Sequence, residues 1–405
     1  MRVESCIVLR PSSHFSGTVQ VPGSKSISNR VLLMGALAEG KSKFFGILES
    51  DDTRYMRDAL EKLGKPKNAS FPNKKADLFL GNAGTVMRSL TAVLCLGSGE
   101  YILRGEPRMH ERPIKDLADA LRTLGANIEY LENDGCPPLK IKANGLNGGE
   151  VHIKGNISSQ FLSALLIAAP YCKEPLEIIV DGELISKPYV YMTIRLMEKF
   201  GIKVENSDYK SFKIEKGFYK AQTLEIEGDA SSASYFWAGA AITKGDIIVK
   251  GIEKDSLQGD VKFLEALEKM GTELNGITIN ANLFPDAAMT ICPVACYAKG
   301  KTKITGIASW KVKETDRISA MANELRKVGA EVITGDDFIE IVPPEVIKPA
   351  TIETYNDHRM AMCFSLLSLN SPNKKGAEIT ILNPSCVNKT FPEYFKEFKK
   401  LSEPC

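Results

Sequence analysis

One pattern recurs along this chain: a helical segment that ends in glycine and is followed by a strand-like stretch. The glycines of this pattern are Gly64, Gly125, Gly201, Gly271 and Gly329. Each is expected just past the last helical turn, where the backbone takes a positive φ that glycine reaches without steric cost. A repeat of this kind constrains the fold because each copy must form the same supersecondary unit.

A second helical segment, rich in Ala, Leu and Met, precedes each glycine-ended helix and leads into a β-branched strand. Six such segments are found, beginning near Ser24, Asn82, Ser158, Asp229, Pro285 and Asn356. Stretches such as 161–169 and 235–242 have almost no charge and are expected to be buried, whereas charged stretches such as 115–122 and 260–269 are expected to form outer helices. The sequence therefore predicts an α/β fold in which a unit of strand, helix, strand, helix and further strands occurs six times.

The length of 405 residues exceeds what one hydrophobic core usually organises, so two domains are expected. Three repeats in each domain would place a boundary near Glu227. Lys and Arg number 52 against 50 acidic residues, and a net charge of +2 gives no reason to expect a nucleic-acid or membrane-surface partner. The first residues lack the apolar core of a signal peptide, and no apolar run approaches the roughly 20 residues of a membrane span. We therefore expect a cytoplasmic protein.

The nine cysteines are scattered without CxxC spacing, which favours reduced thiols over a disulfide framework. Cys292 and Cys296 lie four residues apart and could share a helix face as metal ligands. Because no His or carboxylate lies nearby in the sequence, we interpret both as core residues.

The six inner helical segments open with Ser, Thr, Asn, Asp or Gly, which are residues that cap free backbone N–H groups. Capping alone would explain one such start, but a helix N-terminus also attracts phosphate or carboxylate. Cations fall within or beside these loops: Lys25, Arg30, Arg88, Arg108, Arg112, Lys313, Arg317, Arg359 and Lys389. Neither a P-loop nor a GxGxxG motif is present. The sequence thus predicts sites for small polyanions at the helix starts.

Seven motifs resemble, in matching order and over essentially the full length, those of 5-enolpyruvylshikimate-3-phosphate (EPSP) synthases. They occupy residues 22–30, 82–85, 106–113, 158–161, 311–317, 356–360 and 389–392. The resemblance implies a two-domain inside-out α/β barrel of six βαβαββ repeats, three per domain. It also implies a discontinuous domain of residues 1–21 and 228–405, an inserted domain of residues 22–227, and an active site in the cleft between them.

The resemblance implies an enzyme that transfers the enolpyruvyl group of phosphoenolpyruvate to the 5-hydroxyl of shikimate 3-phosphate, on the route to chorismate and aromatic amino acids. The family uses no metal or organic cofactor, and we expect a monomer. By motif match, shikimate 3-phosphate would contact Lys25, Ser26, Arg30, Ser158, Ser159, Gln160, Ser186, Tyr189, Asp286, Ser309 and Lys313. Phosphoenolpyruvate would contact Lys25, Asn82, Gly84, Arg112, Gln160, Arg317, His358, Arg359 and Lys389.

Two carboxylates can divide the proton transfers of such a reaction. The resemblance points to Asp286 as the base toward the hydroxyl and to Glu314 as the group that exchanges a proton with the methylene carbon, with Lys25 assisting. For either acid, helix capping is an equally good alternative. Lys313 and Arg317 favour the ionised form of Glu314, so we expect bound substrate anions to neutralise these cations.

Three positions depart from the usual pattern of the family. Ser309 stands where Asn is common, Ser89 where Pro is usual, and Val86 where a smaller residue is found. The change at Ser89 alters a helix start, so we expect moderately reduced sensitivity to glyphosate. Gly84 is retained, which argues against complete resistance.

Two other functions remain as alternatives. UDP-N-acetylglucosamine enolpyruvyl transferases share the fold and the donor, but they normally have Lys-Asn in the first loop, where this chain has Lys25-Ser26, and a reactive Cys in the second repeat. A non-catalytic anion-binding protein of the same fold is the second alternative. The presence of both Asp286 and Glu314 argues against it.

Overall fold

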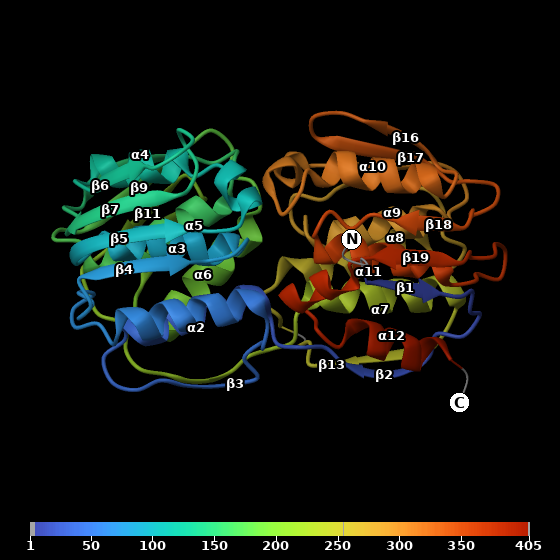
Figure 1. The fold of residues 1–405 in the computed structure, drawn as a ribbon, viewed down its shortest axis with the longest axis horizontal. Coiled ribbons are helices and arrows are strands. Elements are labelled where there is room, and N and C mark those ends of the chain that lie inside the picture. Colours follow the sequence, from blue (N-terminus) through green and yellow to red (C-terminus); the bar gives the residue numbers. More distant parts are fainter. Residues whose placement is uncertain (1–4, 254, 404–405) are drawn as a thin grey trace. The chain divides into compact units, whose positions relative to one another are not determined.

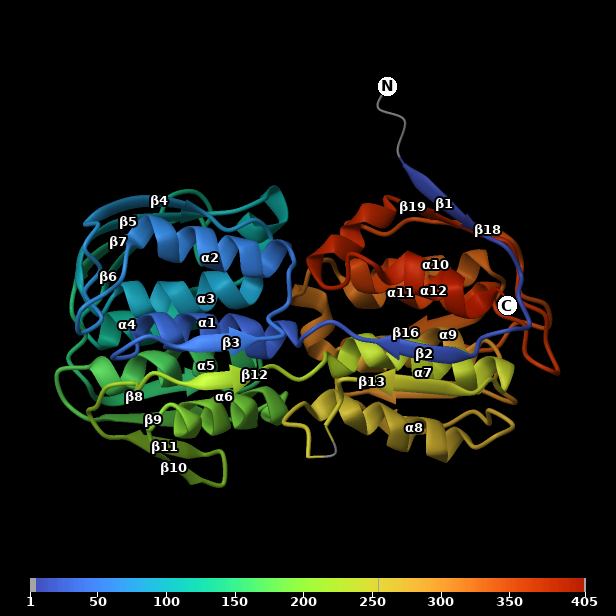
Figure 2. The ribbon, with the colours of Figure 1, turned by 90° about the horizontal axis from the view of Figure 1, so that it is seen from below.

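The computed structural model describes residues 5–253 and 255–403. The chain divides into two compact units (Figures 1 and 2). We call Ser24–Ile226 the inserted unit, and the chain up to Gly23 together with the chain from Glu227 onwards the discontinuous unit.

The inserted unit contains two four-stranded sheets and a pair of strands. Its helices are α1 (Lys25–Leu37), α2 (Asp51–Leu63), α3 (Gly84–Leu94), α4 (Lys115–Thr123), α5 (Ser159–Ala168) and α6 (Lys187–Lys199), with short 3-10 helices η1 (Pro107–Glu111) and η2 (Ala169–Tyr171). Its strands are β3 (Lys43–Phe45), β4 (Lys75–Phe79), β5 (Ser98–Arg104), β6 (Asn127–Tyr130), β7 (Leu139–Asn144), β8 (Gly149–Lys154), β9 (Leu176–Asp181), β10 (Val204–Ser207), β11 (Ser211–Ile214) and β12 (Thr223–Glu225). The sheet orders are β4-β5-β7-β6 and β8-β9-β11-β10, and β3 pairs with β12 in parallel.

The discontinuous unit is completed by the start of the chain. Its helices are α7 (Ala230–Thr243), α8 (Phe263–Met270), α9 (Ile291–Ala295), α10 (Arg317–Lys327), α11 (His358–Ser365) and α12 (Tyr394–Ser402), with η3 (Gly259–Lys262), η4 (Ala287–Thr290), η5 (Ala308–Val312), η6 (Leu366–Ser368) and η7 (Pro384–Lys389). Its strands are β1 (Cys6–Leu9), β2 (Gly17–Gln20), β13 (Ile247–Lys250), β14 (Thr278–Asn280), β15 (Thr302–Thr305), β16 (Glu331–Thr334), β17 (Phe338–Val342), β18 (Ala350–Ile352) and β19 (Ile379–Leu382). Strand β1 pairs with β19 and β2 with β13, so the first strands belong to this unit.

Three sheets share one topology. In β4-β5-β7-β6, β8-β9-β11-β10 and β14-β15-β17-β16, the first two strands are parallel, and each remaining pair is antiparallel. A helix follows the first strand of each sheet and precedes the second, as the parallel pairing requires. The mixed α/β class expected from the sequence is therefore confirmed.

The glycine-ended helices have the backbone expected of them. Gly64, Gly125, Gly201, Gly271 and Gly329 have φ values of 74°, 97°, 88°, 66° and 98°. An L-residue with a Cβ adopts such values at a steric cost, which explains why glycine recurs at these helix ends.

Burial follows the charge pattern of the helices, with one exception. Residues 161–169 are wholly buried, and α5, which most of them form, lies beside α3 (Figure 1). Helices α4 and α8 alternate buried and exposed positions, as outer helices do. The stretch 260–269 is expected to form an outer helix, and residues from Phe263 onwards do so as α8, whereas Asp260 lies before that helix and is only 4% exposed.

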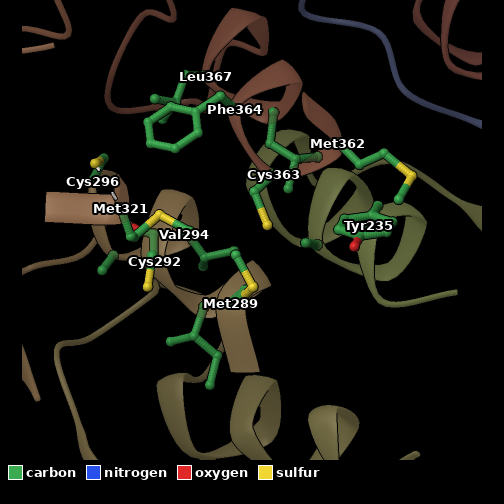
Figure 3. Close-up of a cluster of buried hydrophobic side chains, with 14 of the residues drawn as sticks. Tyr235, Met289, Cys292, Val294, Cys296, Met321, Met362, Cys363, Phe364 and Leu367 are labelled. Carbon is green, nitrogen blue, oxygen red and sulfur yellow. Dashed lines mark hydrogen bonds between the residues drawn. The ribbon is translucent and has the colours of Figure 1, made fainter. Parts of the chain in front are cut away.

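Sulfur atoms fill part of the core of the discontinuous unit. Figure 3 shows Cys292, Cys296 and Cys363 among methionine and aromatic side chains, and all three cysteines are buried. Burial raises the pKa of Cys296 to about 12, which keeps it a neutral thiol. The interpretation of Cys292 and Cys296 as core residues is confirmed. Within residues 5–253 and 255–403, no cluster of three His, Cys, Asp or Glu side chains suited to a metal ion is found. None of the helices in these ranges is both long and apolar enough to cross a membrane.

Candidate functional site

The discontinuous unit holds a cluster of buried charges with Arg317 at its centre. This residue begins α10 and is 1% exposed. Its guanidinium donates to both carboxylate oxygens of Asp357, at 2.7 and 3.3 Å, to Glu314 Oε2 at 2.8 Å and to Asp286 Oδ1 at 3.2 Å. Burial by itself lowers the pKa of Arg317, but the three carboxylates outweigh burial and raise it. Arg317 is therefore a permanent cation shared by three acids.

Asp286 brings three cations together on one carboxylate. Besides Arg317, Arg359 Nη2 donates to Oδ2 at 3.0 Å, and Lys313 Nζ lies 3.5 Å from Oδ1. The Asp286 side chain is 15% exposed, so it stays partly open although both arginines are buried. Asp286 directly precedes η4, but its side chain makes no capping hydrogen bond to that helix. The alternative of a plain helix cap is therefore wrong for Asp286.

Glu314 lies in the loop between η5 and α10 and is 7% exposed. Its Oε2 accepts the bond from Arg317, and Lys389 Nζ, at the end of η7, lies 4.0 Å from Oε1. The cap of α10 is Asp316, whose carboxylate accepts from the Ser319 backbone N–H. Capping does not account for Glu314 either.

Asp357 is a member of this cluster that was not among the expected site residues. It is fully buried and caps α11, where Oδ1 accepts from the Arg359 backbone N–H at 2.9 Å. The same carboxylate binds the guanidinium of Arg317, so Asp357 joins the start of α11 to that side chain. His358 is also fully buried, and its Nδ1 lies 3.4 Å from Asp357 Oδ1. The sequence Asn-Asp-His-Arg indicated that a helix is capped here. It did not indicate the ion pair between Asp357 and Arg317, because tertiary packing brings these two residues together.

The loops that carry these charges are fixed by hydrogen bonds to neighbouring segments. Trp310 is fully buried, and its Nε1 donates to the Pro285 carbonyl at 2.8 Å, directly before Asp286. Tyr355 and Asn356, which precede Asp357, both have a φ of 53°. Such a conformation costs about 1–3 kcal/mol for an ordinary residue, and it persists only where the surroundings impose it. Here the Tyr355 hydroxyl donates to Glu324 Oε1 on α10 at 2.8 Å, and Glu324 is fully buried.

The inserted unit contains a buried arginine of a different kind. Arg30, on α1, is 3% exposed and donates to Thr193 Oγ1 at 2.8 Å, to the Ser26 carbonyl at 2.9 Å, and to Ser163 Oγ and the Tyr189 carbonyl at 3.4 Å. These four acceptors are two hydroxyl oxygens and two backbone carbonyls, and none of the four is charged. Burial lowers the pKa of Arg30 to about 10, and no carboxylate offsets this effect. An anionic ligand would supply the missing charge.

Asn82, Gly84 and Arg112 form a second group in this unit. Arg112 Nη1 donates to the Asn82 carbonyl at 3.0 Å and to its Oδ1 at 2.8 Å. A Cβ added to Gly84 would lie 2.6 Å from Arg112 Nη2, so the guanidinium lies directly against the first residue of α3. Glycine is required here for a close approach between backbone and cation.

The remaining expected residues of the inserted unit lie at three helix starts. Lys25 begins α1, and its Nζ lies 3.7 Å from Asp52 Oδ2. Ser158 caps α5 by accepting from the Gln160 backbone N–H, and Ser159 is the first residue of that helix. Ser186 precedes α6 with a φ of 54°, and its carbonyl accepts from the Tyr189 backbone N–H.

The bonds described above join most expected residues into local groups within each unit. Asp286, Lys313, Glu314, Arg317, Arg359 and Lys389 form one connected group, to which Asp357 links His358. Ser309 is 8% exposed and lies in η5, near this group in sequence. Ser24 was expected to cap α1, but its side chain makes no capping bond, so that expectation is wrong.

The family model for EPSP synthase (3-phosphoshikimate 1-carboxyvinyltransferase) matches residues 9–398. The chain belongs to the EPSP synthase family. A 3-phosphoshikimate 1-carboxyvinyltransferase of Marinomonas sp. (strain MWYL1) is 51% identical, over 98% of this chain and 99% of the relative. One of Sulfurovum sp. (strain NBC37-1) is 52% identical over the same shares. The resemblance seen in the seven motifs is confirmed, and the UDP-N-acetylglucosamine enolpyruvyl transferase alternative is not favoured.

Solved EPSP synthase structures also match the chain. An EPSP synthase from Acinetobacter baumannii has a TM-score of 0.80 at 25% identity, covering 99% of this chain and 98% of that chain. A second structure from the same organism has a TM-score of 0.79 at 24% identity and covers 98% of each chain. The fold of EPSP synthases therefore extends over nearly the whole of this chain.

Proposed function

We propose that this chain transfers the enolpyruvyl group of phosphoenolpyruvate to the 5-hydroxyl of shikimate 3-phosphate and releases phosphate, in the route to chorismate. The observation that carries the proposal is the buried cluster in which two carboxylates, Asp286 and Glu314, share Arg317. It combines a candidate base, a candidate proton donor and a cation for an anionic substrate. Family membership over residues 9–398 supports the same reaction.

The residues of the inserted unit are proposed to bind the anionic groups of both substrates. Shikimate 3-phosphate would contact Lys25, Ser26, Arg30, Ser158, Ser159, Gln160, Ser186 and Tyr189 there, and Asp286, Ser309 and Lys313 in the other unit. Phosphoenolpyruvate would contact Lys25, Asn82, Gly84, Arg112 and Gln160, together with Arg317, His358, Arg359 and Lys389. Support comes from Arg30, whose acceptors are all uncharged, and from the Arg112 guanidinium packed on Gly84.

The chemistry proceeds by addition and then elimination. Asp286 accepts the proton of the 5-hydroxyl as its oxygen bonds to C2 of phosphoenolpyruvate, and Glu314 gives a proton to the methylene carbon, which becomes a methyl group. In the second step the C2–O bond to phosphate breaks, phosphate leaves with the proton that Asp286 had accepted, and the methyl group returns a proton to Glu314. The same group can serve as acid and then as base because the two steps are the reverse of each other at that carbon. Lys25 assists by binding the developing negative charge.

The finer architecture is also a proposal. The inserted and discontinuous units would be the two domains of an inside-out barrel of six βαβαββ repeats, with residues 22–227 as one domain and residues 1–21 and 228–405 as the other. The topology shared by three sheets supports repetition. We further propose that the enzyme works in the cytoplasm as a monomer.

A phosphate-release assay tests the proposed reaction. The enzyme is given phosphoenolpyruvate alone, with shikimate 3-phosphate, or with UDP-N-acetylglucosamine. Release that requires shikimate 3-phosphate is the expected result. Release with the nucleotide sugar would identify the sister activity, and no release with either acceptor would favour a non-catalytic anion-binding protein.

Replacing Arg30 with methionine is expected to weaken shikimate 3-phosphate binding by about 100-fold, because a buried phosphate would lose its cation. The melting temperature without ligand is expected to change little, since Thr193 Oγ1 keeps its bonds to Ser163 Oγ and the Tyr189 carbonyl. Calorimetric titration and thermal unfolding with and without the ligand measure the two effects. Arg195→Met, an exposed change on α6, is the matched control and should leave binding intact. Wild-type affinity in Arg30→Met would remove Arg30 from the site.

Replacing Gly84 with alanine is expected to raise the KM for phosphoenolpyruvate by about 10-fold or more, while the KM for shikimate 3-phosphate changes little. The new Cβ would lie 2.6 Å from Arg112 Nη2 and must displace that guanidinium from its bonds to Asn82. Steady-state kinetics with each substrate varied in turn separate the two constants. Equal changes in both constants would show that Arg112 does not act on phosphoenolpyruvate alone.

A further inference from the structure

We propose that Asp260 is a positioning residue that holds Asp286 in place through the backbone, an inference that rests on the role proposed for Asp286. Asp260 lies in η3 and is 4% exposed. Its Oδ1 accepts from the Ala287 backbone N–H at 2.8 Å. That N–H belongs to the peptide that joins Asp286 to η4. Asp260 thus supplies from another segment the cap that Asp286 itself does not provide.

The segment that carries Asp260 is itself tied to a second helix start. Gln258, also 4% exposed, donates from Nε2 to the Gly228 carbonyl at 2.7 Å and accepts at Oε1 from the Ala230 backbone N–H at 3.0 Å. Two residues of one short segment therefore bond to the backbone at the starts of α7 and η4. A side chain anchored in this way can fix the atom to which it bonds.

Asp286 is held on both sides. On the preceding side, Trp310 Nε1 donates to the Pro285 carbonyl at 2.8 Å. On the following side, Asp260 accepts from Ala287. The carboxylate between these two bonds must meet Arg317 and Arg359 at hydrogen-bond distance, and a displacement of 1 Å in such a group can cost about 100-fold in rate.

The charge of Asp260 is costly to the fold, which suggests a functional reason to keep it. Burial raises the pKa of Asp260 to about 6, and the like charges of Asp286 and Asp229 add to this rise. The positive charge of Arg359 and the hydrogen bond from the Ala287 N–H oppose it. Because the pKa is higher in the fold than its ordinary 3.8, the wild type loses stability as the pH rises from about 4 to about 6. An asparagine at this position keeps the acceptor oxygen and removes the charge.

The test compares Asp260→Ala with Asp260→Asn at pH 8, measuring kcat, both KM values and thermal unfolding. Asp260→Ala is expected to lower kcat by about 10- to 100-fold with much smaller changes in KM. Asp260→Asn is expected to restore kcat to within about 3-fold of wild type and to raise the melting temperature, since a buried charge is gone. A kcat in Asp260→Ala that equals wild type would overturn the proposal, as would an Asp260→Asn enzyme as slow as Asp260→Ala.

Two further variants keep the result unambiguous. Asp286→Asn is measured in parallel: if it keeps wild-type kcat, the role of Asp286 is wrong and the Asp260 proposal falls with it. If Asp286→Asn is slow but Asp260→Ala is not, only the Asp260 proposal fails. Should Asp260→Ala not fold, Trp310→Phe removes the donor on the other side of Asp286 and keeps most of the ring. A lowered kcat in that variant supports the positioning of Asp286 through its flanking peptides, and an unchanged kcat overturns it.

Discussion

Replacing Arg317 with methionine is expected to lower the free energy of unfolding by about 3–5 kcal/mol, the effect of removing one partner from a buried ion pair. Methionine has a similar length but no charge. Asp357, which is fully buried, and Glu314, which is 7% exposed, would lose the cation that they share with Asp286. Urea unfolding of both proteins under the same conditions measures the difference.

The control for this change lies on the same helix. Arg326 is exposed on α10, and Arg326→Met is expected to alter stability by less than about 1 kcal/mol. Arg317→Lys should fall between the two, because a lysine keeps the charge but cannot donate to three carboxylates in the same plane. An Arg317→Met protein as stable as Arg326→Met would show that the buried cluster does not depend on its central cation.

Replacing Glu314 with glutamine is expected to reduce kcat by about 10²- to 10⁴-fold with both substrates saturating, the usual contribution of a general acid–base group. Glutamine can still accept a hydrogen bond from Arg317 but cannot exchange a proton with carbon. Glu331→Gln, an exposed change on β16, is the matched control and should leave kcat unaltered. Near-normal turnover in Glu314→Gln would remove the assigned role, and thermal unfolding of each variant shows that the protein is folded.

Features that depend on neighbouring residues were predictable from the sequence. The glycines at helix ends, Gly64 among them, need only a local backbone conformation, and Ser158 caps its own helix. The burial of apolar stretches such as 161–169 was equally predictable, because a helix without charged residues has no face suited to water. Arg317 and Glu314 were predicted as site residues from one motif, and the structure joins them by a hydrogen bond.

Features made by tertiary packing were not predictable. Asp260 stands at the head of a charged stretch that reads as an outer helix, yet it precedes α8 by one turn of η3 and points to a peptide far along the chain. Asp286 has the position of a cap, but Arg317 and Arg359 take its carboxylate, and Asp260 caps the helix instead. No pattern in a single sequence shows which of two aspartates performs each role.

Two of the departures from the family pattern, Val86 and Ser89, lie on α3. Ser89 lies in the second turn of α3 rather than at its first residue, and both Ser89 and Val86 are buried. The reduced glyphosate sensitivity expected from Ser89 therefore stays a prediction, and it would act through the packing of α3 on its neighbours. Gly84, at the start of the same helix, keeps the close approach to Arg112.

The most direct test of the account is the fate of the methylene hydrogens of phosphoenolpyruvate. The enzyme is run in D₂O with both substrates, and the product is examined by NMR for deuterium in its enolpyruvyl methylene group. Addition and elimination through a methyl group, with Glu314 exchanging the proton, predict that deuterium enters this methylene. A product whose methylene keeps its original hydrogens in full would contradict the account, because the carbon would then never have been protonated.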